Sequence, residues 1–228
     1  MCVDAQRLGT LSTRSLAVRR VIVIGLVVFL SSAAAWASSP PGDARLEAAK
    51  RYFRTAELAR PGAPVRAEAY AKVEDLAKQI LASDPGSADA HFLLFAAEGR
   101  RLLLDSGKPS VANFWKYRDV NKHLDRALEL DPSHPNALAA RGGILLDLPP
   151  VLGGDPEQAT RLLQRAVDLN PTGLGTHVTL ARALLLRGDR DGARQHLLLA
   201  AHYACLKHEA APLMQAEDLL AKLTAGSP

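Results

Sequence analysis

The sequence predicts an all-α fold, a helical-repeat superhelix of about four helix pairs closed by a C-terminal capping helix. Alanine and leucine fill long stretches such as ALAARGGILL and TLARALLLRG, and both residues favour helices because they lose little freedom there. Similar phrases that end in proline recur along the chain. With 48% hydrophobic and 23% charged residues, the chain can bury a sizeable core.

The first 37 residues are typical of a secretory signal peptide. Four arginines precede or border an apolar stretch, VIVIGLVVFL at 21–30, and the segment ends in the small-residue pattern Ala35-Trp36-Ala37. We expect cleavage after Ala37 and a periplasmic or secreted protein. The alternative is an uncleaved N-terminal membrane anchor over 21–37, which has the minimum length for a span. In that case the leader would be the only membrane contact.

The charge of the chain is concentrated in this leader, which holds four arginines and one aspartate. The whole chain carries +4, so the remainder carries only +1. A nearly neutral body lacks the basic surface that phosphate binding requires. The sequence therefore predicts no nucleic-acid partner.

Residues 38–43, SSPPGD, are predicted to be a linker, because proline and glycine interrupt helices. The folded repeat domain is expected over 44–224. In the remaining chain Cys205 has no second cysteine to pair with, which excludes an intramolecular disulfide.

Three helix endings repeat in the folded part: QILASDP at 79–85, RALELDP at 126–132 and RAVDLNP at 165–171. Proline ends each helix because it has no N–H and clashes with the preceding turn. The last two phrases share the pattern A-[LV]-x-L-[DN]-P, which resembles the end of the second helix of a tetratricopeptide (TPR) unit. The resemblance implies units at about 44–85, 86–132, 133–171 and 172–205, and a cap at 211–224.

Capping residues predict the same boundaries. Asp155 stands before Pro156 as an N-cap, with Gln158 at the position of a capping box. Gly188-Asp189 repeats the step Gly154-Asp155 in the next unit. The final helix is expected to begin at Pro212 and to cover the last apolar face, as terminal repeats do.

Two units exceed the TPR length of about 34 residues, and both excesses fall between a unit's two helices. One lies near 105–110 and the other at 149–154. Turns inside units share one edge of a TPR array, so the resemblance places both insertions on that edge. They are either partner-binding loops or tolerated loop drift. The candidate edge residues are Lys108, Pro109, Pro150, Val151 and Leu152.

The first helices of TPR units line a groove, and matched positions suggest which residues face it. The lining is mostly small and apolar, which suits an apolar peptide or a partner helix. Asn136 and Arg182 are candidate donors to a backbone or carboxylate. A carboxylate clamp needs more cations than this groove offers. The candidate groove residues are Phe92, Arg100, Asn136, Thr179 and Arg182.

Motifs for catalysis are missing from the sequence, including H-E-x-x-H, G-x-S-x-G, C-x-x-C and the P-loop. The spacing of His196, His202 and His208 turns successive members to different helix faces. We therefore predict a protein that is not an enzyme and has no metal or cofactor.

Two functions follow from these features. The first is an exported scaffold that binds a protein or peptide partner in the cell envelope. The second is a ligand-handling accessory subunit, because the long units, the Gly-Gly-Asp loop and the last helix are similar to the TPR partner proteins of TRAP transporters. That resemblance implies a trimer beside a substrate-binding protein. The oligomeric state is not fixed by the sequence.

Overall fold

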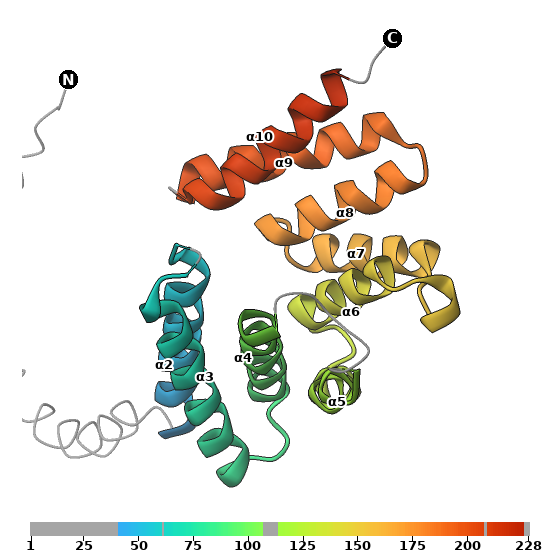
Figure 1. Ribbon diagram of the computed structural model, residues 1–228. Helices are drawn as coiled ribbons and strands as arrows, with labels where there is room; N and C mark the ends of the chain where they lie inside the picture. Colours follow the sequence, from blue (N-terminus) through green and yellow to red (C-terminus); the bar gives the residue numbers. More distant parts are fainter. Residues whose placement is uncertain (1–40, 61, 107–113, 208, 226–228) are drawn as a thin grey trace, which may run out of the picture. The chain divides into compact units, whose positions relative to one another are not determined.

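The computed structural model describes residues 41–60, 62–106, 114–207 and 209–225, and the described residues contain helices and no strand (Figure 1). Residues from 42 onward form one compact unit. The described helices, in chain order, are α2 (Pro41–Leu58), α3 (Pro64–Ser83), α4 (Ala88–Ser106), α5 (Phe114–Leu130), α6 (Pro135–Asp147), the short 3-10 helix η3 (Pro150–Leu152), α7 (Pro156–Leu169), α8 (Leu174–Leu186), α9 (Arg190–Lys207) and α10 (Ala210–Ala225).

The helices pack as successive pairs, α2 with α3, α4 with α5, α6 with α7 and α8 with α9, followed by α10 on α9. We call these pairs units 1 to 4. Each of the four hydrophobic clusters contains side chains from three consecutive helices, so every cluster joins one unit to the next helix. This arrangement confirms the predicted all-α repeat of four pairs and a cap. It also means that α10 covers the apolar face that unit 4 would otherwise expose.

The three turns between units have one construction, which explains the recurring [DN]-P phrase. The C-cap residues are Asp84, Asp131 and Asn170, and the N–H of each donates to the carbonyl four residues earlier. The side chain of each also accepts a hydrogen bond from the residue two positions later. Proline follows each cap and prevents the helix from continuing. The acid or amide therefore satisfies the turn while proline ends the helix.

Small residues set the distance between paired helices. Gly142 in α6 is buried, and a Cβ added there would lie 2.7 Å from Cγ of Leu163 in α7. Gly143, the next residue, faces open space apart from Thr179 Cγ2 at 3.9 Å. The close approach of α6 and α7 therefore depends on one of two adjacent glycines.

Two predicted boundaries differ from the structure. Helix α2 begins at Pro41, so 41–43, expected in the linker, are helical. Proline fits the first turn of a helix because the N–H it lacks would have no partner there. For the same reason α10 begins at Ala210, ahead of Pro212, which lies inside its first turn.

No helix among the described residues is long and apolar enough to cross a membrane. The predicted signal peptide, and the possible anchor at 21–37, lie outside the described residues.

Candidate interaction site

The loop between α6 and α7 is fixed by backbone hydrogen bonds. The N–H groups of Leu152 and Gly154 both donate to the carbonyl of Pro149, and that of Gly153 donates to Pro150. The N–H of Asp155 donates to the carbonyl of Leu145, 3.0 Å away. The first three bonds close the loop on itself, and the last holds its C-terminal end against α6. The insertion predicted at 149–154 is therefore an ordered structure.

Two glycines make this path possible for different reasons. Gly153 has φ +91°, a left-handed conformation that side chains other than glycine rarely adopt. At Gly154 an added Cβ would lie 1.8 Å from the carbonyl oxygen of Leu148. Gly188 has φ +82°, the same left-handed conformation as Gly153. The predicted equivalence of Gly188-Asp189 and Gly154-Asp155 holds for the cap, because Asp189 Oδ1 accepts from the N–H of Gly192 at 2.8 Å at the start of α9.

Asp155 caps α7 as predicted, because its Oδ1 accepts from the N–H groups of Glu157 and Gln158 at 3.0 and 2.8 Å. The other half of the predicted capping box is different. The N–H of Asp155, which Gln158 would bind in a capping box, donates to Leu145. The N-cap thus joins the loop to both α6 and α7.

The fixed loop presents apolar side chains to solvent. Val151 is 91% exposed and Leu152 is 58% exposed, while Leu148 is 37% exposed and Pro150 is also exposed. We call these four residues the edge surface. A partner that covered these side chains would remove their apolar area from water. An ordered loop would also lose little conformational freedom on binding.

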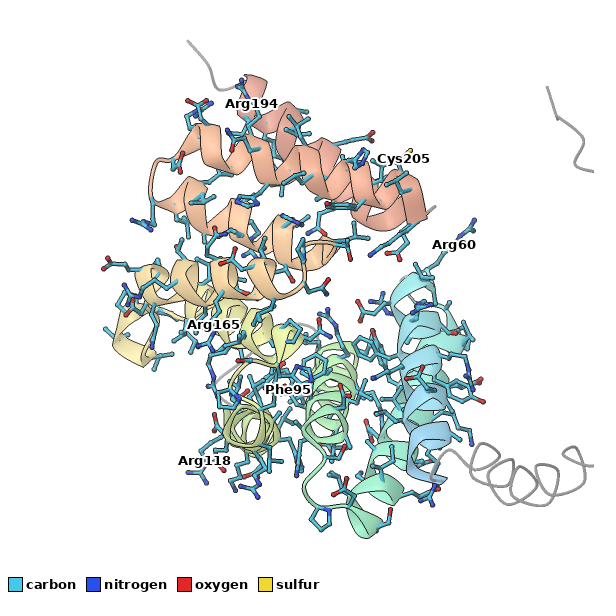
Figure 2. The ribbon with its side chains drawn as sticks, turned by 180° about the vertical axis from the view of Figure 1, so that it is seen from behind. Arg60, Phe95, Arg118, Arg165, Arg194 and Cys205 are labelled. Carbon is cyan, nitrogen blue, oxygen red and sulfur yellow. The ribbon has the colours of Figure 1, made fainter. Side chains whose placement is uncertain are left out.

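The turn between α8 and α9 lies on the same side of the repeat domain as the edge surface, as Figures 1 and 2 show. It carries another exposed apolar residue, Leu186, which is 67% exposed. Lys108 and Pro109, the other predicted edge residues, lie outside the described residues. Whether the two insertions are neighbours therefore stays a prediction.

The two predicted groove cations are already paired inside the protein. Arg100 donates from Nε to Glu57 Oε1 at 3.0 Å and from Nη2 to Oε2 at 3.4 Å. Arg182 donates to Asp147 Oδ1 at 2.6 Å. Each pair joins one unit to the next. An acidic peptide would have to compete with these carboxylates, so Arg182 is not the free donor that the sequence suggested.

The other groove candidates differ in position. Phe92 is half-buried, with its ring centroid 5.1 Å from that of His134, and packs into the core. The hydroxyl of Thr179 donates to the carbonyl of Gly175 within α8. Asn136 is exposed and borders an open pocket of about 390 Å³ at the turns on either side of unit 2. Whether the five candidates line one groove stays a prediction.

Asp89 also borders this pocket and connects three helices. Its Oδ2 accepts from Lys50 Nζ of α2, and its Oδ1 pairs with His134 Nε2 before α6, both at 3.2 Å. The hydrogen bond from His134, together with the hydrogen bond and the charge of Lys50, lowers the pKa of Asp89 to about 2 despite partial burial. The site is a structural junction between units 1, 2 and 3.

Two histidine pairs in the structure were not predicted from the sequence. His91 of α4 meets His123 of α5, and His177 of α8 meets His196 of α9. The sequence contains a signal for them, since His91 and His177 each stand six residues after the proline that ends the preceding unit. Among the described residues no group of three or more histidine, cysteine, aspartate or glutamate side chains could hold a metal ion.

Residues 152–204, which run from the edge loop through α9, match the family model for the tetratricopeptide repeat. This segment is therefore similar in sequence to a tetratricopeptide repeat. The predicted TPR resemblance is confirmed where its register is clearest. No curated protein matches the chain.

Several solved TPR-like structures are similar to the chain at low identity. TTC0263, a thermophilic TPR protein of Thermus thermophilus, is 17% identical over 84% of this chain and 96% of its own, with a TM-score of 0.46. MamA is 16% identical over 75% and 98%, with a TM-score of 0.40. YrrB, described as a TPR protein with an unusual peptide-binding site, is 14% identical over 83% and 95%, with a TM-score of 0.41. At these scores, the fold assignment depends on the helix order and packing described above.

Proposed function

We propose that this protein is an exported, non-enzymatic TPR scaffold that binds a protein partner of the cell envelope through the edge surface. The observation that carries the proposal is the ordered α6–α7 loop, which holds Val151 at 91% exposure. A surface loop that only joined two helices would not need apolar side chains held away from the core. Exposed apolar groups on a fixed backbone favour binding because little entropy is lost on association.

The electrostatics of the first helices support an apolar contact over a charged one. Arg100 and Arg182 are paired with Glu57 and Asp147, so neither offers a free cation to an acidic tail. The edge surface itself carries no charged residue. We therefore propose a partner with an apolar patch or an amphipathic helix. This partner would dock on the edge of units 3 and 4.

Export is supported by the leader sequence. We propose cleavage after Ala37, which would give a mature chain that begins at Ser38. Cell fractionation followed by N-terminal sequencing tests this step. A cytoplasmic protein that keeps its first 37 residues would contradict export, and a membrane-bound protein that keeps them would support the anchored alternative.

Partner binding can be tested by photocrosslinking from position 151 in cells. A photoreactive residue at Val151 should capture one defined protein, and the double substitution V151S/L152S should abolish co-purification of that protein. L198S is a matched control because Leu198 is 54% exposed on α9 and is not part of the edge surface. Both variants should keep wild-type helicity and melting temperature, since all three substituted side chains are exposed.

Two results would contradict this function. Equal loss of the partner in V151S/L152S and in L198S would show that the edge surface is not the contact. Native mass spectrometry that finds a trimer retaining a small molecule would favour the accessory subunit of a transport system.

A further inference from the structure

Both histidine pairs have the same geometry. Nδ1 of His91 lies 3.1 Å from Nδ1 of His123, and Nδ1 of His177 lies 3.0 Å from Nδ1 of His196. In each pair the first ring also faces the carbonyl of a turn proline. Nε2 of His91 lies 3.2 Å from Pro85 O, and Nε2 of His177 lies 2.8 Å from Pro171 O.

These contacts assign the protons. A carbonyl oxygen only accepts, so Nε2 of His91 and of His177 must carry the hydrogen. A neutral imidazole has one N–H, which leaves Nδ1 of these two rings as an acceptor. The hydrogen between the rings therefore belongs to Nδ1 of His123 and of His196. Each pair forms a chain of donors that ends on a turn carbonyl.

This chain limits how many protons a folded pair can bind. One added proton can sit on Nε2 of His123 or His196 and leave both hydrogen bonds intact. A second added proton would have to bind Nδ1 of His91 or His177. Two N–H groups would then face each other across the 3.1 or 3.0 Å between the Nδ1 atoms. The unfolded chain binds two protons per pair, so acid favours opening.

Burial adds to this limit. His177 is only 1% exposed, and partial burial is the main cause that lowers the pKa of His123 and of His196. The groups that face the first pair are Glu98, which favours its charged form, and Lys78, which opposes it. Near the second pair, Asp189 favours the charged form. The ring of Tyr203 stacks on His177, and the ring of His202 lies edge-on to that of Tyr203.

Unit 3 has apolar residues at the same positions. Leu138 stands six residues after Pro132, as His91 and His177 do after their prolines, and it is buried. Leu162 stands four residues before Ala166, as His123 and His196 do before Ala127 and Ala200. The repeat therefore accepts leucine at both positions of the pair. The histidines of units 2 and 4 are not required by the packing of the fold.

We propose that the pairs His91–His123 and His177–His196 act as acid-sensitive latches, which open the helix pairs of units 2 and 4 in mild acid while unit 3 stays closed. A shared metal ion is less consistent with the site, because no third ligand converges among the described residues. The latches are independent of the edge surface and do not rest on the function proposed above.

The test compares urea unfolding of the full chain at pH 7 and pH 5. With an ordinary pKa of 6.5 for each unfolded histidine and one proton fewer in the folded pair, the folding equilibrium constant should fall about 20-fold per pair over this range. The variants H91L/H123L and H177L/H196L copy the leucines of unit 3. In each variant the fall in the folding equilibrium constant between pH 7 and pH 5 should be about 20-fold smaller than in wild type. H202L is the control, because His202 is exposed and outside both pairs.

The proposal would be overturned if the folding equilibrium constant fell as much between pH 7 and pH 5 in both leucine variants as in wild type. If a leucine variant does not fold, nitrogen-15 NMR of the wild-type histidines decides instead. The proposal requires Nε2–H on His91 and His177, Nδ1–H on His123 and His196, and titration of each pair as a coupled unit. Four rings that titrate independently with an ordinary pKa would refute it. A rise in stability at pH 7 on addition of Zn²⁺ would replace the latch with a metal site.

Discussion

His134 donates from Nε2 to Oδ1 of Asp89 across 3.2 Å, and its own Nδ1 accepts the N–H of Ala137 at 3.2 Å. The contact with Ala137 fixes the direction of the bond to Asp89. Because Nδ1 accepts from a backbone N–H, the proton of the imidazole must be on Nε2. His134 therefore caps α6 and holds α4 with the same ring. The bond to Asp89 does not require a charged imidazole.

Replacement of Asp89 by asparagine should destabilise the protein at neutral pH and leave it almost unchanged near pH 2. The carboxylate pKa is about 2 in the folded protein and 3.8 ordinarily, so the folded state is favoured above pH 3.8 and loses this advantage as the pH falls to about 2. Because the side chain is 41% exposed, we expect about 1 kcal/mol at pH 7, less than the pKa shift alone would give.

Urea unfolding of wild type and D89N between pH 7 and pH 2 checks this effect. D119N is the control, since the side chain of Asp119 is 64% exposed and pairs with Lys122 of the same helix, α5. A constant difference between wild type and D89N across the range would show that the loss comes from packing and not from the charge.

Alanine at two adjacent glycines of α6 should change the free energy of unfolding in opposite directions. G142A places a methyl group 2.7 Å from Leu163 Cγ, and overpacking of this kind costs about 2 kcal/mol. G143A meets only Thr179 Cγ2 at 3.9 Å, so the better helix propensity of alanine should stabilise by about 0.5 to 1 kcal/mol. Thermal and urea unfolding of both variants measure this difference. Equal effects would mean that α6 and α7 do not approach as closely as described.

Alanine at Gly154 should disrupt the edge loop. The added Cβ would lie 1.8 Å from the carbonyl oxygen of Leu148, a backbone atom that cannot rotate away, and we expect a loss of about 3 kcal/mol. G175A is the control, because nothing lies within 4 Å of a Cβ there. It should be neutral or stabilise slightly. G154A should also abolish partner capture from position 151, and retained capture would show that the loop conformation is unimportant for binding.

The repeat architecture was accessible from the sequence because its signals are local. The phrase RALELDP contains the small packing residue, the C-cap acid and the terminating proline within seven positions. Each of these acts on its own helix end, so no tertiary information is needed. The same applies to Asp155, which caps the helix that immediately follows it.

The pairing of side chains between helices was not accessible in the same way. Arg182 meets Asp147 across 35 positions and Arg100 meets Glu57 across 43. Such contacts depend on how each helix is rotated about its axis, and a shift of one residue turns a side chain by about 100°. For that reason Arg182 was predicted to be a groove donor, and the histidine pairs were not predicted. The start of α2 was misplaced because the proline and glycine of 38–43 were taken as helix breakers, while Pro41 in fact begins the helix.

The C-terminal helix should contribute strongly to the stability of unit 4 through one residue. Leu223 is 4% exposed and packs in the cluster that contains Val178 and Leu197, and its carbonyl accepts from Arg190 Nη2 at 2.6 Å. L223A would leave a cavity against α8 and α9 and should cost about 3 kcal/mol. L206A is a matched control with the same chemical change, since Leu206 on α9 is 63% exposed and its loss should stay within about 0.5 kcal/mol. Urea unfolding measures both. If the two variants lost equal stability, α10 would not be the cap of the repeat, and the apolar face of unit 4 would need another cover.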